Sequence, residues 1–322
     1  MSTKRFVCHI SSIRLDHFLT ICLSTSRNRV TELIKNAFVS VNNIKQTKAG
    51  LKLKENDAVT IQLPELKKSE SKEVDFDIPI VFEDNDILII NKPPHLTVHP
   101  APSVKEPTLV DWLKSKNISL STLSGEERNG IVHRIDKDTS GALIVAKNNA
   151  AHMNLAKQLE NRTLGRYYLA LIDYPLKNDT IVDKPVGRNP KNRLKMAIVQ
   201  NGRAAKSAFC SLLTNEKEEI ELIAAKLFTG RTHQIRVHLS ALGRHILGDD
   251  LYGFKSQKDK INRVMLHAYC LYLIHPASGE KMIFTAPLYD DFEEQLLKFF
   301  TKEKLNETLC ADAITLRLNT TS

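Results

Sequence analysis

Apolar residues recur every three or four positions in two short stretches near the start of the chain, and alternate with polar residues in two stretches that follow. The first spacing is typical of amphipathic helices and the second of strands with one buried face. The predicted elements are, in order, helices over residues 13–23 and 27–36 and strands over residues 39–41 and 57–63. Ser26 is placed to cap the second helix, and Asn42-Asn43 suits a turn after the first strand. The pattern predicts a small helix–helix–hairpin domain over residues 13–63.

A change in composition separates this first domain from the rest of the chain. Residues 64–77 are mostly charged and contain few apolar positions. Such a segment has little apolar surface to bury in a core, so it predicts a flexible linker. We place the boundary between two domains within it.

The second domain, residues 78–302, contains apolar runs of strand length separated by turn residues. Thr108 and Asp111 have the spacing of a capping box, and Thr232 and Gly243 are expected to begin and end a later helix. The predicted strands cover residues 80–82, 87–90, 142–146, 166–172, 205–213, 220–228, 264–274 and 281–286, and the predicted helices cover 109–116, 150–161, 232–242 and 291–302. Few helices and no regular strand–helix alternation predict an α+β fold with a mixed, mostly antiparallel sheet. Residues 303–322 are expected to form a poorly ordered tail.

The chain is basic, and much of its positive charge lies in the first domain. The 322 residues carry a net charge of +9, and residues 1–63 contain ten Lys or Arg against four Asp or Glu, a net charge of +6. Such a surplus suits a polyanionic partner, with nucleic acid ahead of an anionic membrane. With 42% hydrophobic and 26% charged residues, the composition is that of a globular protein rather than a disordered one.

The sequence also bears on location and redox state. No apolar run approaches the roughly 20 residues that a membrane span needs, and the first residues lack the apolar centre of an export signal. The five cysteines are widely spaced and include no Cys-x-x-Cys pair, which disfavours a disulfide framework and a cysteine zinc site. We therefore expect a cytoplasmic protein with reduced thiols. We also expect it to be a monomer.

A polar stretch from Gly130 to Gly141 precedes the strand predicted over residues 142–146. It contains two carboxylates, two cations and two hydroxyls, with Asp136 at its centre. Loops attached to rigid strands often carry catalytic residues, although Asp, Ser and Gly are also ordinary turn residues. The residue types alone leave a reaction site and a solvated turn as equal alternatives.

Several stretches of the second domain resemble the motifs of the RluA family of RNA pseudouridine synthases. The polar loop, with HRIDKDTSG, resembles the family signature H-R-(Leu/Ile)-D-x-x-T-S-G. The segment VFEDNDILIINKPPHLTVHP resembles the first motif, except that His95 stands where the family usually has Gly. The run RYYLA resembles the family's Lys-x-Tyr-x-Ala segment, and TGRTHQIRVHL with LGDDLYG resembles the third motif. In this domain the resemblance covers about residues 80–300.

The resemblance implies an enzyme that isomerises uridine in RNA to pseudouridine without a cofactor or a metal. Asp136 would be the catalytic nucleophile or base, and Arg236 would pair with it, being able to bind a carboxylate bidentately. Tyr168 would stack on the uracil and bring a hydroxyl to its reacting edge. The uridine must leave a helix to reach a carboxylate, and Arg134 would fill or open the gap. Asp138 falls two positions late and is interpreted as a loop-stabilising carboxylate.

The first domain resembles the S4 RNA-binding module in the segments RLDHFL, SRNRVTELIKNAFVSVNN and ENDAV. The basic second helix and the hairpin of such a module would hold structured RNA mainly through phosphates and shape. A basic segment over residues 184–203 could also track a phosphate backbone. The candidate RNA-binding residues are Arg27, Arg29 and Lys35 of the helix and Arg188 and Arg193 of the basic segment.

Four functions remain as alternatives at this point. An S4 module joined to this catalytic domain looks most like the large-subunit branch of the family, RluD- or RluC-like, acting on 23S ribosomal RNA or a pre-ribosomal particle. A tRNA-specific member is the second alternative. A non-catalytic RNA-binding or ribosome-assembly protein is the third, and the complete set of Asp136, Tyr168 and Arg236 disfavours it. A carboxylate hydrolase is the fourth, and it would need Asp136 and Asp138 to cooperate.

Overall fold

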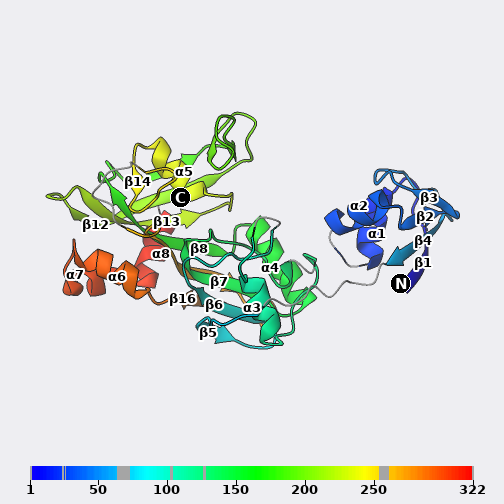
Figure 1. Cartoon of the computed structure of the whole chain (residues 1–322), viewed down its shortest axis with the longest axis horizontal. Helices are drawn as coiled ribbons and strands as arrows, with labels where there is room; N and C mark the ends of the chain where they lie inside the picture. The colour runs from blue at the N-terminus through cyan, green and yellow to red at the C-terminus, as the bar shows by residue number, and fades with distance from the viewer. Residues whose placement is uncertain are drawn as a thin grey trace.

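The computed structural model describes residues 2–23, 25, 27–63, 73–101, 104–125, 128–253 and 261–320 (Figure 1). The predicted cap Ser26 and most of the predicted linker lie outside these residues. Among the described helices, none is both long and apolar enough to cross a membrane. The five cysteines are unpaired.

The first domain is a four-stranded antiparallel sheet with two helices and a core of its own. Its elements are β1 (Ser2–Val7), α1 (Leu15–Leu23), α2 (Arg27–Lys35), β2 (Val39–Val41), β3 (Ile44–Gln46) and β4 (Ala58–Leu63). The sheet order is β1-β4-β2-β3. The predicted helices, strands and turn are present, and Asn42 and Asn43 have φ of 49° and 66°. Leu15, Leu19 and Ile34 from the helices pack with Ile61 of β4.

Strand β1 extends this domain beyond its predicted start at residue 13. It pairs with β4 along its whole length, from Ser2 opposite Leu63 to Val7 opposite Ala58. Most of its side chains are exposed, so no alternation of apolar and polar positions marks it in the sequence. It is an edge strand whose formation depends on the neighbouring strand rather than on its own pattern.

A ten-stranded sheet organises the second domain in the order β5-β6-β7-β15-β8-β13-β12-β9, with β14 beside β8 and β16 beside β15. The β7–β15 pair is parallel, and the other described pairs of this sheet are antiparallel. The predicted mixed, mostly antiparallel sheet is therefore confirmed. The strands are β5 (Ile80–Glu83), β6 (Ile87–Lys92), β7 (Ser140–Ala146), β8 (Gly165–Asp173), β9 (Thr180–Asp183), β12 (Lys206–Asn215), β13 (Ile220–Leu227), β14 (His245–Ile246), β15 (Leu266–Ile274) and β16 (Lys281–Thr285). Strands β10 (Val186–Arg188) and β11 (Met196–Ile198) form a separate ribbon within the predicted basic segment.

The middle of this sheet is buried on both faces. Along β6, Leu88 and Ile90 enter one hydrophobic core while Ile87 and Ile89 enter another. Helices α3 (Leu109–Ser115), α4 (Asn149–Glu160) and α5 (Gln234–Ala241) lie close to their predicted positions. The rigid central strands provide the support on which the polar loop before β7 is built.

The predicted N-cap of α5 is wrong. The helix begins at Gln234, and its N-cap is His233, which has a left-handed φ of 56° and makes no side-chain cap hydrogen bond. The Thr232 hydroxyl instead accepts a hydrogen bond from Arg134 at 3.2 Å. The end of the helix is as predicted, since Gly243 follows it with φ of 70°.

The end of the chain is more regular than predicted. Helix α6 (Asp290–Leu297) stops earlier than expected, and the supposed tail contains helices α7 (Lys302–Thr308) and α8 (Ala311–Thr320). Ile314 and Leu318 lie four residues apart on one side of α8 and are buried in the larger core, the one that contains Leu88 and Ile90. Helix α8 lies against β12 and β13. Contact with the sheet therefore stabilises a segment whose own apolar pattern is too short to predict a helix.

The second domain also begins earlier than residue 78. Val74 and Phe76 pack against the larger core. The Asp77 carboxylate accepts a hydrogen bond from the Trp112 indole at 3.0 Å. Residues 73–77 of the predicted linker are thus part of the folded domain.

Candidate active site

The polar loop enters β7 in the interior of the sheet. Ile131 and Ile135 are buried on either side of Arg134, while the Asp136 side chain is 19% exposed. The Asp136 carbonyl closes a turn by accepting from the Thr139 amide at 3.2 Å. The apolar anchors fix the loop and leave one carboxylate facing outward.

A close approach between strands explains the glycine that ends the loop. Gly141 has φ of 112°, and a Cβ at this position would collide with the backbone of Ala268 in β15. On its other side Ala268 is the register partner of Tyr168 in β8. The small residues therefore bring the beginning of β7 and Tyr168 to the two sides of one strand.

Two buried basic side chains hold the backbone beside Asp136. The Lys92 ammonium donates to the carbonyls of Pro93, Leu96 and Lys137 at 2.6, 3.0 and 3.0 Å. Burial lowers the pKa of Lys92 to about 7, and attraction to Asp138 and Asp136 opposes the change. Nη1 of Arg263 lies 3.4 Å from the Asp138 carbonyl oxygen. Carbonyls on the C-terminal side of Asp136 are thus held by N–H donors of two basic side chains.

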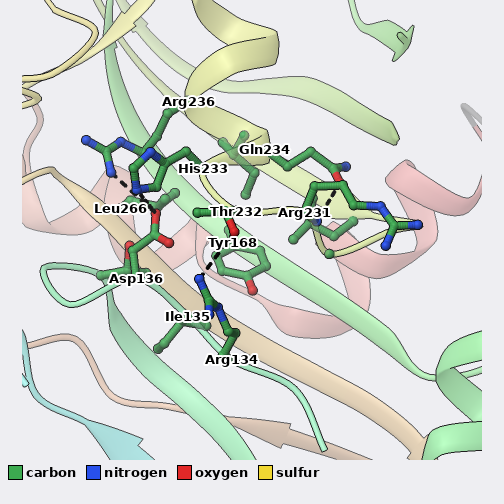
Figure 2. Close-up of a pocket in the computed structure, with 14 residues that line it drawn as sticks. Arg134, Ile135, Asp136, Tyr168, Arg231, Thr232, His233, Gln234, Arg236 and Leu266 are labelled. Carbon is green, nitrogen blue, oxygen red and sulfur yellow. Dashed lines mark hydrogen bonds and ion pairs between the residues drawn. The ribbon is translucent and has the colours of Figure 1, made fainter. Parts of the chain in front are cut away.

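The Arg236 guanidinium contacts two carboxylates. Its Nε and Nη2 each donate to Asp249 at 2.7 Å. Its Nη1 lies 3.4 Å from Oδ2 of Asp136, and Figure 2 shows these two side chains facing each other. Burial opposes the charged form of Arg236, but the hydrogen bonds and attraction to Asp249, together with Asp136, raise its pKa above the usual value. The predicted proximity of Arg236 and Asp136 is present, but the expected bidentate geometry is directed to Asp249 instead.

Tyr252 and His233 complete the surroundings of the carboxylate. The Tyr252 ring lies 5.0 Å from the Arg236 guanidinium carbon. Its hydroxyl accepts from the Met196 amide at 2.7 Å and lies 2.9 Å from Nδ1 of His233. The hydroxyl proton is thus available to Nδ1, which leaves the proton of a neutral His233 on Nε2, 3.9 Å from Asp136. Burial lowers the pKa of His233 and Asp136 opposes this, so the neutral ring is favoured.

Tyr168 lines the same pocket as Asp136 and Arg236, with Ile135 and Leu266 as apolar neighbours. Figure 2 shows its ring beneath Thr232 and beside the Asp136 loop. Burial raises the pKa of Tyr168 to about 12, Arg166 opposes the shift and Asp136 adds to it. The hydroxyl therefore stays protonated at neutral pH, next to an aromatic face that can stack on a base.

The structure brings Asp136, Tyr168, Arg236 and Arg134 to one pocket. Arg134 is exposed at its rim. Asp138 points elsewhere, since its Oδ1 lies 3.0 Å from Nδ1 of His95 and its side chain is 49% exposed. His95 has φ of 62°, a conformation that Gly adopts freely, which accounts for the Gly that the resemblance leads one to expect there.

The remaining candidate RNA-binding residues do not line this pocket. Arg188 and Arg193 are exposed on the β10–β11 ribbon, where Arg188 donates to the Arg193 carbonyl at 2.8 Å. In the first domain Lys35 is exposed, whereas Arg27 forms an ion pair with Asp16 at 2.9 Å. Arg29 is half-buried on the same helix.

Sequence reasoning did not find Asp249, Tyr252 or His233 as parts of the site. All three lie in stretches that resemble the third family motif, so the resemblance contained the signal. The resemblance does not show which of these side chains contact each other. No spacing rule connects Asp249 to Arg236, because they are 13 residues apart and separated by the end of a helix.

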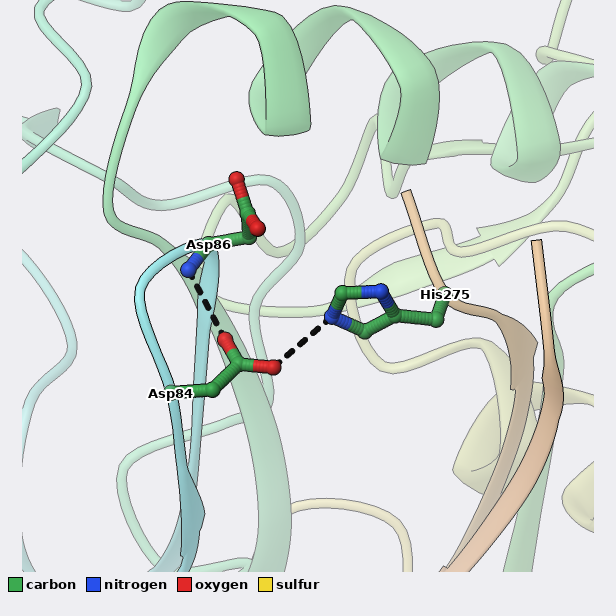
Figure 3. Close-up of side chains that lie close together, drawn as sticks. All are labelled: Asp84, Asp86 and His275. Carbon is green, nitrogen blue, oxygen red and sulfur yellow. Dashed lines mark hydrogen bonds and ion pairs between the residues drawn. The ribbon is translucent and has the colours of Figure 1, made fainter. Parts of the chain in front are cut away.

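A second group of acidic and histidine side chains, drawn in Figure 3, does not line this pocket. One ligand atom from each of Asp84, Asp86 and His275 lies within 4.8 Å of the others. Asp84 already accepts from the amides of Asp86 and Ile87 and lies 2.8 Å from Nε2 of His275. Nδ1 of His275 accepts from the Ser278 amide, which leaves the proton on Nε2 and directs it to Asp84. The group thus joins two turns by hydrogen bonds. These hydrogen bonds occupy most of the lone pairs of Asp84 and His275 that could bind a metal.

Comparisons with known proteins show the family and the fold of the chain. Residues 86–241 match the family described as RNA pseudouridylate synthase. A Helicobacter pylori protein named as an RNA pseudouridine synthase is 49% identical over 320 residues, which is 97% of this chain and 97% of the relative. The ribosomal large subunit pseudouridine synthase D of Zymomonas mobilis is 38% identical over 290 residues, or 87% of this chain and 92% of the relative. The structure of human RNA pseudouridylate synthase domain containing 1 covers 73% of this chain and 98% of its own, with a TM-score of 0.52 at 24% identity, which shows a shared fold.

Identity at this level over nearly the whole length is decisive for family membership, and it agrees with the fold and with the motif residues gathered at one pocket. The chain belongs to the RNA pseudouridine synthase family, is of the RluA type, and is an isomerase.

Proposed function

We propose that this protein converts specific uridines of 23S ribosomal RNA to pseudouridine in the cytoplasm, with Asp136 as the catalytic carboxylate. The supporting observation is the arrangement of Asp136, which faces a pocket and lies 3.4 Å from an arginine that a buried Asp249 holds in place. Relatives named ribosomal large subunit pseudouridine synthase D, at 37–38% identity, support ribosomal RNA as the substrate.

The reaction rearranges bonds within one nucleotide. The bond from N1 of uracil to C1′ breaks, the uracil turns in place, and a bond from C5 to C1′ forms. The proton lost from C5 is balanced by one gained at N1. Asp136 would attack C1′ or remove the C2′ proton and later return it, and both routes need a carboxylate beside the ribose. A cation that stays charged is suited to hold that carboxylate throughout.

Tyr168 would hold the detached uracil. Its ring offers a stacking face, and its hydroxyl, protonated because burial raises the pKa to about 12, offers a hydrogen-bond donor to the base. A uridine within a helix cannot present C1′ to Asp136, so the nucleotide must be flipped out. Arg134, at the rim of the pocket, would occupy the space that the base leaves.

We further propose that the first domain is an S4-like RNA-binding domain that holds the substrate without taking part in the chemistry. Its helix α2 carries Arg29 and the exposed Lys35, and its net charge favours contact with phosphates. Arg27 would contribute less, because Asp16 already pairs with it. Arg188 and Arg193 on the β10–β11 ribbon would add contacts from the catalytic domain.

The experiment compares pseudouridines in RNA from cells with and without this protein. Carbodiimide treatment followed by primer extension maps each pseudouridine in ribosomal RNA and tRNA. We expect one or a few stops in 23S ribosomal RNA to disappear, and to return with the wild-type protein but not with Asp136→Asn. Loss of stops only in tRNA would support a tRNA-specific enzyme instead, and an unchanged map would contradict the proposal.

A further inference from the structure

A larger cavity adjoins the Asp136 pocket. It has a volume of about 560 Å³ and shares Arg134, Gly230 and Arg231 with the smaller pocket. Its lining comes from the polar loop, the end of α4, the start of β8 and the turn after β13. The charged residues described along its wall are Arg128, Arg134, Arg162, Arg166 and Arg231 and the single acid Glu160. The cavity is therefore strongly positive.

Arg166 is the deepest of these cations. It is 6% exposed, and none of the residues that the structure describes forms a hydrogen bond with its Nε. None of the described carboxylates pairs with its guanidinium, and its charged neighbour Arg231 repels it. A side chain at position 230 would collide with Nη1 of Arg166, so Gly230 leaves room for the guanidinium. A buried cation without a counter-ion is unfavourable unless another molecule supplies the negative charge.

Two further polar groups of the same cavity lack a partner among the described residues. Nδ1 of His133 and Nδ1 of His99 are buried without hydrogen bonds. Nε2 of His133 accepts from the Ile144 amide at 3.2 Å, so Nδ1 carries the proton and is an unsatisfied donor. Burial, with a smaller contribution from the nearby Arg166, lowers the pKa of His133 to about 3, which keeps the ring neutral. A buried donor and a buried cation thus share one cavity wall.

We infer that this cavity binds a phosphodiester of the RNA strand next to the flipped uridine, with Arg166 as the buried cation that receives it. A phosphodiester supplies the missing negative charge and several acceptors, whereas water satisfies the hydrogen bonds but leaves the charge uncompensated. The shared residues Arg134 and Arg231 connect the cavity to the Asp136 pocket, as one continuous strand requires. This inference rests on the proposed RNA substrate.

The test replaces single phosphates by neutral methylphosphonates in the 23S ribosomal RNA stem-loop that the wild-type protein binds most tightly. Binding is followed by fluorescence anisotropy. At one position flanking the uridine we expect wild type to lose about 10- to 100-fold in affinity, the value of one charged hydrogen-bonded contact. Arg166→Gln should bind unmodified RNA more weakly than wild type by a similar factor. A methylphosphonate at that flanking position should then cause no further loss of affinity in this variant. If each methylphosphonate reduces the affinity of Arg166→Gln by the same factor as that of wild type, the inference is overturned.

Arg317→Gln is the matched control, because Arg317 lies on α8 and pairs with Asp179 at 3.1 Å, and α8 packs on β12 and β13. This variant should keep the wild-type penalty at every phosphate. Arg166→Lys, which keeps a cation in the cavity, should keep part of the penalty at the flanking position. If Arg166→Gln fails to fold, the Lys variant is scanned instead, and a penalty equal to that of wild type at all positions would again overturn the inference.

Thermal unfolding separates this role from a structural one. We expect Arg166→Gln to unfold at the same temperature as wild type or higher, because it removes an uncompensated buried charge. A large decrease would show that Arg166 stabilises the fold and would count against the inference. Binding of RNA needs no turnover, so the two proposals fail separately. If one flanking phosphate loses its penalty in Arg166→Gln but no pseudouridine forms, only the enzymatic proposal is contradicted. If pseudouridine forms but no phosphate loses its penalty in this variant, only the inference is contradicted.

Discussion

Arg236 and Asp249 form a bidentate ion pair in which both nitrogen–oxygen distances are 2.7 Å. The Asp249 side chain is 1% exposed and also accepts from the amides of Leu251 and Tyr252. The ion pair leaves Nη1 of Arg236 to face Asp136 at 3.4 Å. If Asp136 is the catalytic carboxylate, as we propose, Asp249 is a positioning residue that fixes the cation facing it.

Asp249→Asn should slow the reaction without removing the cation. The amide keeps the size of the carboxylate but loses its charge, so Arg236 is free to shift relative to Asp136. Misplacement by about 1 Å can cost on the order of 10²-fold in rate. We expect a loss of this size in single-turnover pseudouridine formation, with little change in RNA affinity. The exposed neighbour supplies the control, Asp250→Asn, and equal rates in the two variants would contradict the role of Asp249.

Arg236→Ala should reduce both rate and stability. It leaves the buried Asp249 carboxylate without a counter-ion, which costs about 3 kcal/mol of unfolding free energy. The double variant Arg236→Ala/Asp249→Asn should recover most of this stability but none of the rate. Arg236→Lys should recover the rate only in part, because an ammonium lacks the planar fork. Urea unfolding with single-turnover kinetics measures both effects, and an Arg236→Ala protein as active as wild type would rule out the proposed pairing with Asp136.

Much of the fold follows from the local pattern of residues. Helix α4 and strands β6, β7 and β8 are long or strongly apolar, and their own periodicity marks them. Strand β1 and helix α8 were outside such reasoning, because partners far away in the sequence stabilise them. Leu318 is buried only because β12 and β13 provide a surface for it.

The candidate site divides in the same way. Asp136, Tyr168 and Arg236 lie in family motifs, so a resemblance in sequence was enough to single them out. The partner of each side chain depends on tertiary geometry, and this is why the bidentate pairing of Arg236 was assigned to the wrong carboxylate. The lack of a described carboxylate beside Arg166 likewise cannot be read from the sequence, since a strand arginine gives no indication of what surrounds it.

The first domain should affect RNA affinity more than chemistry. Replacing Arg29 and Lys35 by Gln should weaken binding of structured RNA and make the slope of log affinity against log salt shallower by about 0.9 for each lost phosphate contact. The rate at saturating RNA should stay unchanged, so kcat/KM falls while kcat does not. Salt titrations and single-turnover kinetics test this. An unaltered salt slope would show that α2 does not contact phosphates.

Deletion of residues 1–72 extends the same test to the whole first domain, whose hydrophobic core shares no residue with those of the second. We expect a folded protein with weaker and less salt-dependent RNA binding. Loss of turnover at saturating RNA in this protein would show instead that the first domain helps to build the active site.

Stability should fall in mild acid through His267. Its Nε2 lies 3.1 Å from the Ala286 carbonyl and its Nδ1 lies 2.8 Å from the Ser140 hydroxyl, at the start of β7. Burial lowers the pKa of His267 to about 4 from 6.5, against the opposing effect of the Ala286 carbonyl. Between these pH values the unfolded chain binds a proton that the folded chain does not. The unfolding free energy therefore decreases as pH falls from 6.5 to 4.

His267→Gln should make this dependence shallower by up to about 1.4 kcal/mol per pH unit. The comparison is urea unfolding of wild type and variant at several pH values between 4 and 7. His17→Gln, at an exposed position on α1, is the control and should behave as wild type. Parallel curves for wild type and His267→Gln would contradict the assignment.

The central claim is that Asp136, and not the nearby Asp138, carries the chemistry. The most direct measurement is single-turnover pseudouridine formation on 23S ribosomal RNA by purified Asp136→Asn and Asp138→Asn. Both variants should fold and bind RNA, since neither side chain is fully buried. We predict no detectable product with Asp136→Asn and most of the wild-type rate with Asp138→Asn. Product formation by Asp136→Asn at the wild-type rate would contradict the account.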